Sequence, residues 1–209
     1  MSISLSTLVA LRLGAAALVT FIGIYCLLAN VFVIKQITLF GLHATCADAF
    51  TIGATFGLNM LQEYYGPKIT KNAIAVNFFV LAFYVLMSSI HLWYQPNLSD
   101  SSHVHFLPLL AHAPRIVVAS FVVYFMAQTL DYYVYGFLKR IWKTRLLMMR
   151  NGLSSALSQL FDTIAFSFLG LYGIVDHIGE IIIISYSIKL LAILLSSPFI
   201  GLSRFFYRP

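Results

Sequence analysis

Two apolar stretches of the sequence each contain a glutamine followed by an aspartate three residues later. Gln128 and Asp131 lie in VVASFVVYFMAQTLDYYVYGFL, and Gln159 and Asp162 lie in GLSSALSQLFDTIAFSFLGLYG. Helical spacing places each glutamine on the same face as its aspartate. A carboxyl group in the middle of a bilayer costs about 2.5–3.5 kcal/mol on insertion scales, so such groups normally face a bundle interior or a wet cavity. The repeated pair therefore predicts a polar site inside a membrane protein.

Carboxylate and carboxamide groups suit a planar ligand that carries donors and acceptors side by side. A guanine-like edge would offer N–H groups to an aspartate and a carbonyl to a glutamine. Both pairs recur at the same offset in sequential, antiparallel helices, and transporters often place their substrate site at such a repeat interface. The alternative is a pair of structural hydrogen bonds between helices, each usually below about 1 kcal/mol.

Lys189 lies near the middle of the apolar stretch IIIISYSIKLLAILLSSPF. A central lysine is as costly as a central aspartate unless it is paired, so we expect Asp131, Asp162 or Glu63 as its partner. The pair would either fix the last helix or hold a charge that is released and re-paired when substrate binds. Both interpretations stay open at this point.

Further polar residues lie close to these stretches. Ser155 is one helical turn before Gln159, and Arg150 lies two residues before the same apolar stretch. Asn59 and Glu63 are four residues apart and share a face of an earlier helix, which Gly66 and Pro67 are expected to end. The position of Glu63 agrees equally well with two roles. Its side chain either reaches the membrane surface or lies at the cytoplasmic mouth of a transport pathway.

The composition predicts an all-α integral membrane protein that forms a single domain over residues 1–209. The chain is 60% hydrophobic and 10% charged, whereas a soluble domain carries about 25% charged residues. Apolar runs of bilayer-spanning length predict six transmembrane helices. They are expected at about 13–34, 45–62, 72–94, 114–138, 150–172 and 180–203. The first of these is expected to remain as a helix rather than to be cleaved as an export signal.

The distribution of basic residues predicts that both termini lie in the cytoplasm. Basic side chains are concentrated after the second, fourth and sixth predicted helices, and the positive-inside rule assigns those ends to the cytoplasmic side. We interpret the basic cluster as orientation and lipid headgroup contact, with no nucleic acid as partner.

The remaining motifs predict packing rather than chemistry. Residues 95–113 are expected to form a polar extracytoplasmic loop whose histidines bind no metal, and no cofactor is expected. Cys26 and Cys46 are expected to be small buried residues. Ala49, Gly53 and Gly57 recur every four residues, which favours close packing of two helices within the chain, with a homodimer interface as the alternative.

Four segments resemble the vitamin uptake transporter family, best known as queuosine precursor transporters. EYYG at 63–66 resembles the end of the family's helix 2 motif, and RNGLSSALSQLFDTIAF at 150–166 is similar to its R…S…SQ.xD[TS]…F segment. AQTLD at 127–131 and K.LA.L.SSP at 189–198 also look similar. The sequence departs from the family at Asn59, where the family usually has an acid.

The resemblance implies a multi-pass protein of the bacterial inner membrane that is not an enzyme. Its substrate would be a nucleobase-like 7-deazaguanine used for tRNA modification: 7-cyano-7-deazaguanine, 7-aminomethyl-7-deazaguanine or queuine. We expect this substrate to be bound by Gln128, Asp131, Gln159, Asp162, Asn59, Glu63, Ser155 and Lys189. Arg150 and Lys189 would pair with charges or gate the site.

Three other functions use the same residues or the same helices. A vitamin-binding subunit of a larger transporter would need an ATPase partner, since the chain contains no P-loop pattern. An intramembrane aspartyl protease would let two aspartates share a proton, but the sequence before Asp162 is bulky. A structural membrane subunit would bind no ligand.

Overall fold

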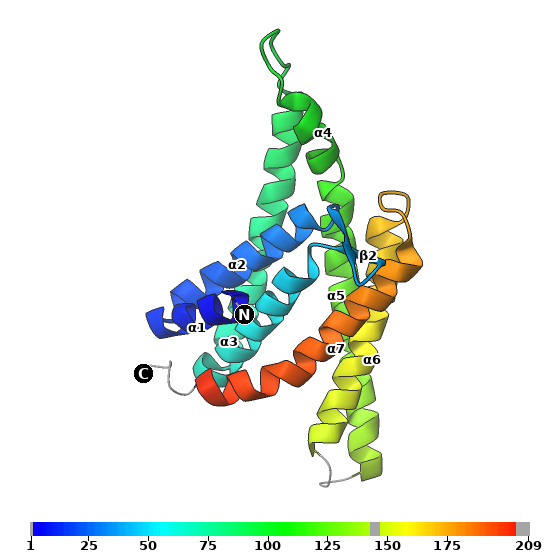
Figure 1. Cartoon of the computed structure of the whole chain (residues 1–209). Coiled ribbons are helices and arrows are strands. Elements are labelled where there is room, and N and C mark those ends of the chain that lie inside the picture. The colour runs from blue at the N-terminus through cyan, green and yellow to red at the C-terminus, as the bar shows by residue number, and fades with distance from the viewer. Residues whose placement is uncertain (1, 143–146, 204–209) are drawn as a thin grey trace. The chain divides into compact units, whose positions relative to one another are not determined.

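The computed structural model describes residues 2–142 and 147–203, and most of them are helical (Figure 1). The chain divides into two compact units. Unit 1 comprises Met1–Gln36, Thr45–Pro114 and Leu194–Pro209. Unit 2 comprises Ile37–Ala44 and Arg115–Ile193. Each unit is built from helices that are apolar along most of their length.

Unit 1 is built around the packing of its first three helices. These are α1 (Ser2–Leu13), α2 (Ala15–Phe32) and α3 (Asp48–Trp93). Their core contains Leu8, Leu11, Leu18, Ile22, Met60 and Leu61, all at most 1% exposed.

The predicted first helix over 13–34 is confirmed as α2, whereas the separate helix α1 before it was not predicted. Gly14, at φ 110°, separates α1 from α2, and such a positive φ is readily adopted only by glycine. The hydroxyl groups of Ser6 and Thr7 both donate to the carbonyl of Ile3, and Ser6 also bonds Tyr25 Oη at 2.7 Å. These local bonds satisfy the polar residues of a segment that was not expected to be helical.

The predicted helices at 45–62 and 72–94 are two parts of α3, and they are separated at Gly66. This residue has φ 83° and ψ 169°, so the expected helix end is confirmed there, although helical structure resumes immediately. The part after the break, Lys68–Trp93, is long and apolar enough to cross a membrane.

The glycines of α3 pack inside the unit. A Cβ atom on Gly53 would collide with Ile3, and one on Gly57 would lie 2.6 Å from Ile22 Cγ1. The prediction of close packing within the chain is therefore confirmed for both glycines, whereas Ala49 is exposed. A homodimer stays a prediction that these two residues do not support.

Unit 2 contains a hairpin, the greater part of α5 (Ala113–Trp142) and the helices that follow. The hairpin, β1 (Gln36–Leu39) and β2 (Leu42–Thr45), was not predicted. Its two turn residues, Phe40 and Gly41, have φ of 51° and 81°, which is the pattern of a two-residue type I′ turn. Phenylalanine is unusual in that conformation, so the sequence carries only half of the usual turn signal.

The last two long helices of the chain are α6 (Leu147–Phe166) and α7 (Ile178–Ser203). A short π-helical segment, η1 (Ser167–Leu171), extends α6. The Arg115 guanidinium, at the beginning of α5, donates to the carbonyls of Leu169 (3.0 Å) and Tyr172 (2.7 Å). Because these carbonyls lie where helical structure ends, a cation is a favourable partner for them.

The prediction of a loop over 95–113 was too long. Residues 103–111 form α4 (His103–Ala111). This helix was not predicted because the polar residues before it indicated a loop for the whole segment. His91 and Phe106 make an edge-on ring contact with centroids 5.2 Å apart. Cys26 and Cys46 are free cysteines, and both are partly buried.

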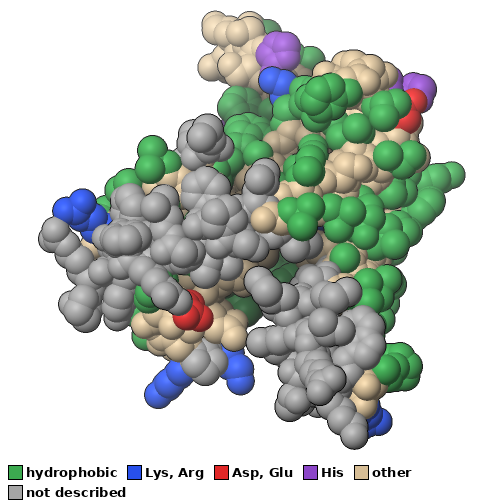
Figure 2. Space-filling view, turned by 60° about the horizontal axis from the view of Figure 1, so that its bottom comes forward, with side chains coloured by type: hydrophobic (Ala, Val, Ile, Leu, Met, Phe, Trp, Pro, Cys, Tyr) green, Lys and Arg blue, Asp and Glu red, His purple; other side chains and the backbone are tan. Residues whose placement is uncertain are grey.

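Three segments of the described helices are long and apolar enough to span a bilayer. They are Ala15–Phe32, Lys68–Trp93 and His103–Ala127. Hydrophobic side chains cover much of the face shown in Figure 2. These findings agree with a membrane protein, and the full set of six spans with both termini in the cytoplasm stays a prediction.

Candidate functional site

The site in unit 2 is built around an ion pair between α6 and α7. Lys189 Nζ lies 2.6 Å from Asp162 Oδ2, and the side chains of the two residues are 10% and 22% exposed. Of the three acids expected as partners for Lys189, the structure selects Asp162. An ammonium group so close to a carboxylate removes much of the cost of placing either charge among apolar helices.

Thr163 supports the lysine from the adjacent position of α6. Its Oγ1 accepts a hydrogen bond from Lys189 Nζ at 3.1 Å and donates to the carbonyl of Gln159 at 2.8 Å. The lysine therefore has two partners on one helix, and Thr163 is 3% exposed. Thr163 was not among the site residues predicted from the sequence. Its position directly after an aspartate in an apolar helix is the signal that would have indicated it.

Several small hydroxyl residues of α6, η1 and α7 are buried in unit 2. Ser154, Ser158, Ser167 and Ser185 are all buried. Tyr186 Oη also donates to the carbonyl of Ala156 at 3.3 Å, which ties α7 to α6. Small polar side chains allow two helix backbones to approach closely in a membrane. The contact is consequently polar at its centre, while the outer faces of both helices are apolar.

The structure tests only some of the site residues that were predicted from the sequence. Gln159 is on the same helix as Asp162, and its side chain is partly buried. Asn59 and Glu63 are exposed and belong to unit 1, so their relation to the ion pair stays a prediction. The side chains of the other predicted residues lie outside the described ones: Gln128, Asp131, Ser155 and Arg150. The second Gln–Asp pair therefore stays a prediction.

Two further buried polar residues of unit 1 were missed by sequence reasoning. Asp48, in the first turn of α3, is 7% exposed. Asn77 is also 7% exposed, and it lies in the part of α3 after Gly66. The signal for Asn77 was present, because it is a lone amide within a long apolar run.

The ion pair permits binding of a ligand with N–H donors. A carboxylate has about four acceptor positions, and Lys189 uses one of those on Asp162, so the group can accept further hydrogen bonds. An aspartyl protease, in contrast, needs its aspartate to share a proton with a second carboxyl group. Asp162 is engaged with an ammonium group instead. Among the described residues, no group of three or more His, Cys, Asp or Glu side chains could hold a metal ion.

Comparison with known proteins matches residues 49–203 to the family described as "putative vitamin uptake transporter". The chain belongs to this family. A curated relative from Bacillus subtilis (strain 168), named "Probable queuosine precursor transporter", is 36% identical over 190 residues. That alignment covers 89% of this chain and 82% of the relative. No solved structure matches the chain.

Membership of the vitamin uptake transporter family confirms the resemblance found in the sequence. The protein is a membrane transporter, and its apolar helices agree with that class. The matched region includes α3 from its second residue onward, Asp162 and Lys189. The ion pair therefore lies within the part of the chain that defines the family.

Proposed function

We propose that this transporter imports a queuosine precursor, a 7-deazaguanine base, across the cytoplasmic membrane for tRNA modification. The relative of known name supports the substrate class, because it aligns with 89% of the chain. The observation that supports a transport site is the Lys189–Asp162 ion pair, which lies between helices that are otherwise largely apolar. The substrate would be 7-cyano-7-deazaguanine, 7-aminomethyl-7-deazaguanine or queuine.

Recognition in this proposal depends on exchange of hydrogen-bond partners at Asp162. The empty site holds the carboxylate against Lys189. The N–H groups of the incoming base then pair with Asp162, and Gln159 contacts the carbonyl or a ring nitrogen of the base. Lys189 keeps Thr163 as a partner while its contact with Asp162 changes. Such a shift in ion pairing would favour a second conformation, as alternating access requires.

The remaining predicted residues complete the proposed pathway. Gln128 and Asp131 provide the second Gln–Asp pair, and Arg150 balances the acids. Ser155 offers a hydroxyl to the base, while Asn59 and Glu63 serve the cytoplasmic mouth. Proton symport, facilitated entry with metabolic trapping and an external ATPase are the three energy sources that these residues allow.

The test uses cells that cannot synthesise queuosine. The chain is expressed, each precursor is supplied in turn, and the modified nucleoside is measured in tRNA. We expect the unsubstituted chain to restore the nucleoside and Asp162→Asn to abolish it while membrane insertion is kept. Asp176→Asn, at an exposed turn residue, is the matched control and should behave like the unsubstituted chain.

Two results would contradict the proposal at different levels. If no precursor gives the modified nucleoside, the substrate assignment is wrong. If Asp162→Asn imports normally, Asp162 is not part of the mechanism. Uptake by the purified chain in liposomes, with and without a pH gradient, separates a self-sufficient transporter from the binding subunit of a larger one.

A further inference from the structure

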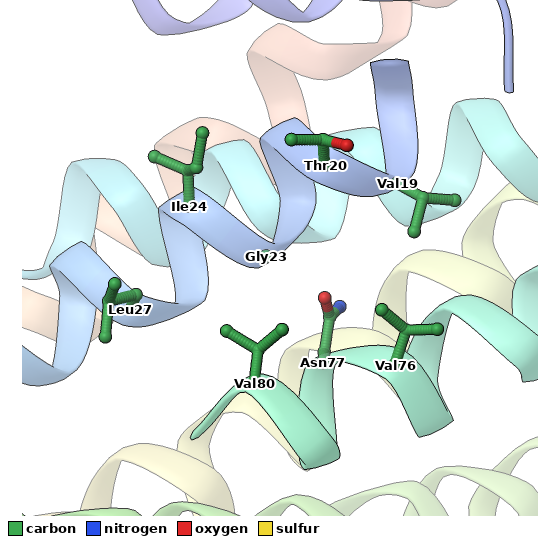
Figure 3. A pocket seen from close by; sticks show the side chains of 8 residues that line it. All are labelled: Val19, Thr20, Gly23, Ile24, Leu27, Val76, Asn77 and Val80. Atoms are coloured by element: carbon green, nitrogen blue, oxygen red, sulfur yellow. The ribbon is translucent and has the colours of Figure 1, made fainter. Parts of the chain in front are cut away.

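Unit 1 contains a half-open cavity between α2 and the part of α3 that follows Gly66. Its volume is about 230 Å³, and its lining is apolar apart from one threonine and one asparagine (Figure 3). The lining residues are Val19, Thr20, Gly23, Ile24, Leu27, Val76, Asn77 and Val80. No residue of the ion-pair site takes part, so this cavity is a separate feature of the molecule.

Asn77 points from α3 into this cavity, toward α2 (Figure 3). Its side-chain oxygen is buried and has no hydrogen-bond partner in the described part of the chain. Asn77 Oδ1 packs closely against α2 at Gly23, because a Cβ atom built there would lie only 3.2 Å from it. The opposite helix therefore presents no side chain at this point and offers the oxygen no donor.

An unpaired carbonyl oxygen in such a position is unfavourable, and hydrocarbon offers no water to satisfy it. The hydroxyl of Thr20 already donates to the carbonyl of Ala16 at 2.9 Å. A ligand that brings its own N–H group would remove the cost. A carboxamide carries an acceptor and a donor side by side, so its best complement is an N–H group adjacent to a carbonyl, as in a cyclic lactam.

The size and lining of the cavity suit a flat ring. A cavity of about 150 Å³ holds benzene, so the larger cavity here has room for a fused bicyclic ring. The aliphatic side chains of Val19, Leu27 and Val80 offer apolar contact for the faces of such a ring. A few polar groups in an otherwise apolar cavity are typical of small-molecule sites.

We infer that this cavity is a second binding site for the transported base and that Asn77 pairs with the lactam edge of its ring. The inference rests on the proposed function, and it adds a residue and a site that are independent of Asp162. A base that is bound at two different places during one passage would meet Asn77 at one and Asp162 at the other.

The test is a binding titration of 7-cyano-7-deazaguanine with the purified full chain. Asp162→Asn should retain one binding site, and adding Asn77→Leu to it should weaken the remaining binding by about 10-fold or more. Asn77→Leu keeps a similar volume and removes the unpaired oxygen, so this variant should unfold at a higher temperature than the unsubstituted chain. 7-Deazapurine lacks the lactam, so its weak binding to Asp162→Asn should change little when Asn77→Leu is added.

A second variant fills the cavity without changing the amide. Val76→Phe, at its rim, should weaken binding as Asn77→Leu does. Val118→Phe makes the same change at an exposed position of α5 and should leave binding unchanged. If adding Asn77→Leu or Val76→Phe to Asp162→Asn leaves binding of the base unchanged, while the unsubstituted chain imports it, this inference is overturned alone. If the unsubstituted chain neither binds nor imports any precursor, the proposed function fails with it.

Discussion

Lys189 and Asp162 form the contact on which the proposed transport chemistry depends. Removal of one partner leaves the other charge without compensation. For fully buried pairs the cost is about 3–5 kcal/mol. Because the Asp162 side chain is 22% exposed, we expect Lys189→Met to lower the free energy of unfolding by less, about 1–3 kcal/mol. Thermal unfolding in detergent measures the change, and Lys71→Met, at an exposed lysine, is the control.

A double variant separates the structural from the functional role of this pair. Lys189→Met combined with Asp162→Asn removes both charges, so most of the lost stability should return, while uptake of the base should stay absent. Recovery of uptake together with stability would show that the pair only fixes α7. The stability and uptake of both single variants and the double variant provide the comparison.

The sequence allowed part of this site to be predicted. A lysine in the middle of an apolar helix requires an acid, and Asp162 was one of three candidates. The choice among them depends on which helix packs against α7, and periodicity within one helix does not contain that information. The role of Thr163 was missed for the same reason, because its contact with Lys189 exists only after α6 and α7 meet.

Gly66 determines where the two parts of α3 separate. Its φ of 83° and ψ of 169° fall in a region that is essentially restricted to glycine, and nothing lies within 4 Å of the position of its missing Cβ. Gly66→Ala should therefore destabilise the chain through backbone strain alone, by about 1–3 kcal/mol. Gly179→Ala is the matched control, since Gly179 also has open space but lies within α7 without a positive φ.

The measurement for both glycines is the free energy of unfolding in detergent. Gly179→Ala should be neutral or slightly stabilising, because alanine is favoured over glycine within helices by up to about 1 kcal/mol. Equal stability of the two variants would contradict the strained conformation of Gly66.

Glu180 connects the hairpin to the beginning of α7. Its Oε2 accepts the backbone N–H of His43 at 2.8 Å, and the rings of His43 and His177 stack with centroids 4.2 Å apart. Glu180→Ala should cost about 1.5–3 kcal/mol, the usual range for a hydrogen bond to a charged group. Hydrogen exchange at the His43 amide should accelerate in this variant. Glu180→Gln, which keeps an acceptor, should retain most of the protection, and equal exchange rates in both variants would exclude this contact as the anchor.

At the scale of elements, the long apolar helices could be predicted and the short elements could not. Composition and length select apolar segments such as Ala15–Phe32 directly. The hairpin was not predicted from the sequence because its strands have only four residues each and its turn begins with Phe40. Its anchor, Glu180, is 137 residues away from His43 in the sequence, so a local pattern cannot reveal it.

For the whole molecule, the arrangement across the membrane follows from the second part of α3. Lys68–Trp93 has 26 residues, and at 1.5 Å per residue it extends about 39 Å, which exceeds a hydrocarbon core of about 30 Å. We therefore predict that its two ends lie on opposite sides of the bilayer. The basic residues Lys68 and Lys71 predict that their end lies in the cytoplasm, so the polar residues around Ser99 should be outside.

Cysteine labelling tests this arrangement. In a chain with Cys26→Ala and Cys46→Ala, Ser99→Cys should react with a membrane-impermeant maleimide in intact cells. Lys71→Cys should react only after the cells are permeabilised, and both positions are exposed, so accessibility does not limit the reaction. Labelling of both cysteines from outside would mean that Lys68–Trp93 does not cross. The opposite pattern would keep the crossing but reverse the orientation, and the proposed cytoplasmic position of Glu63 would be wrong.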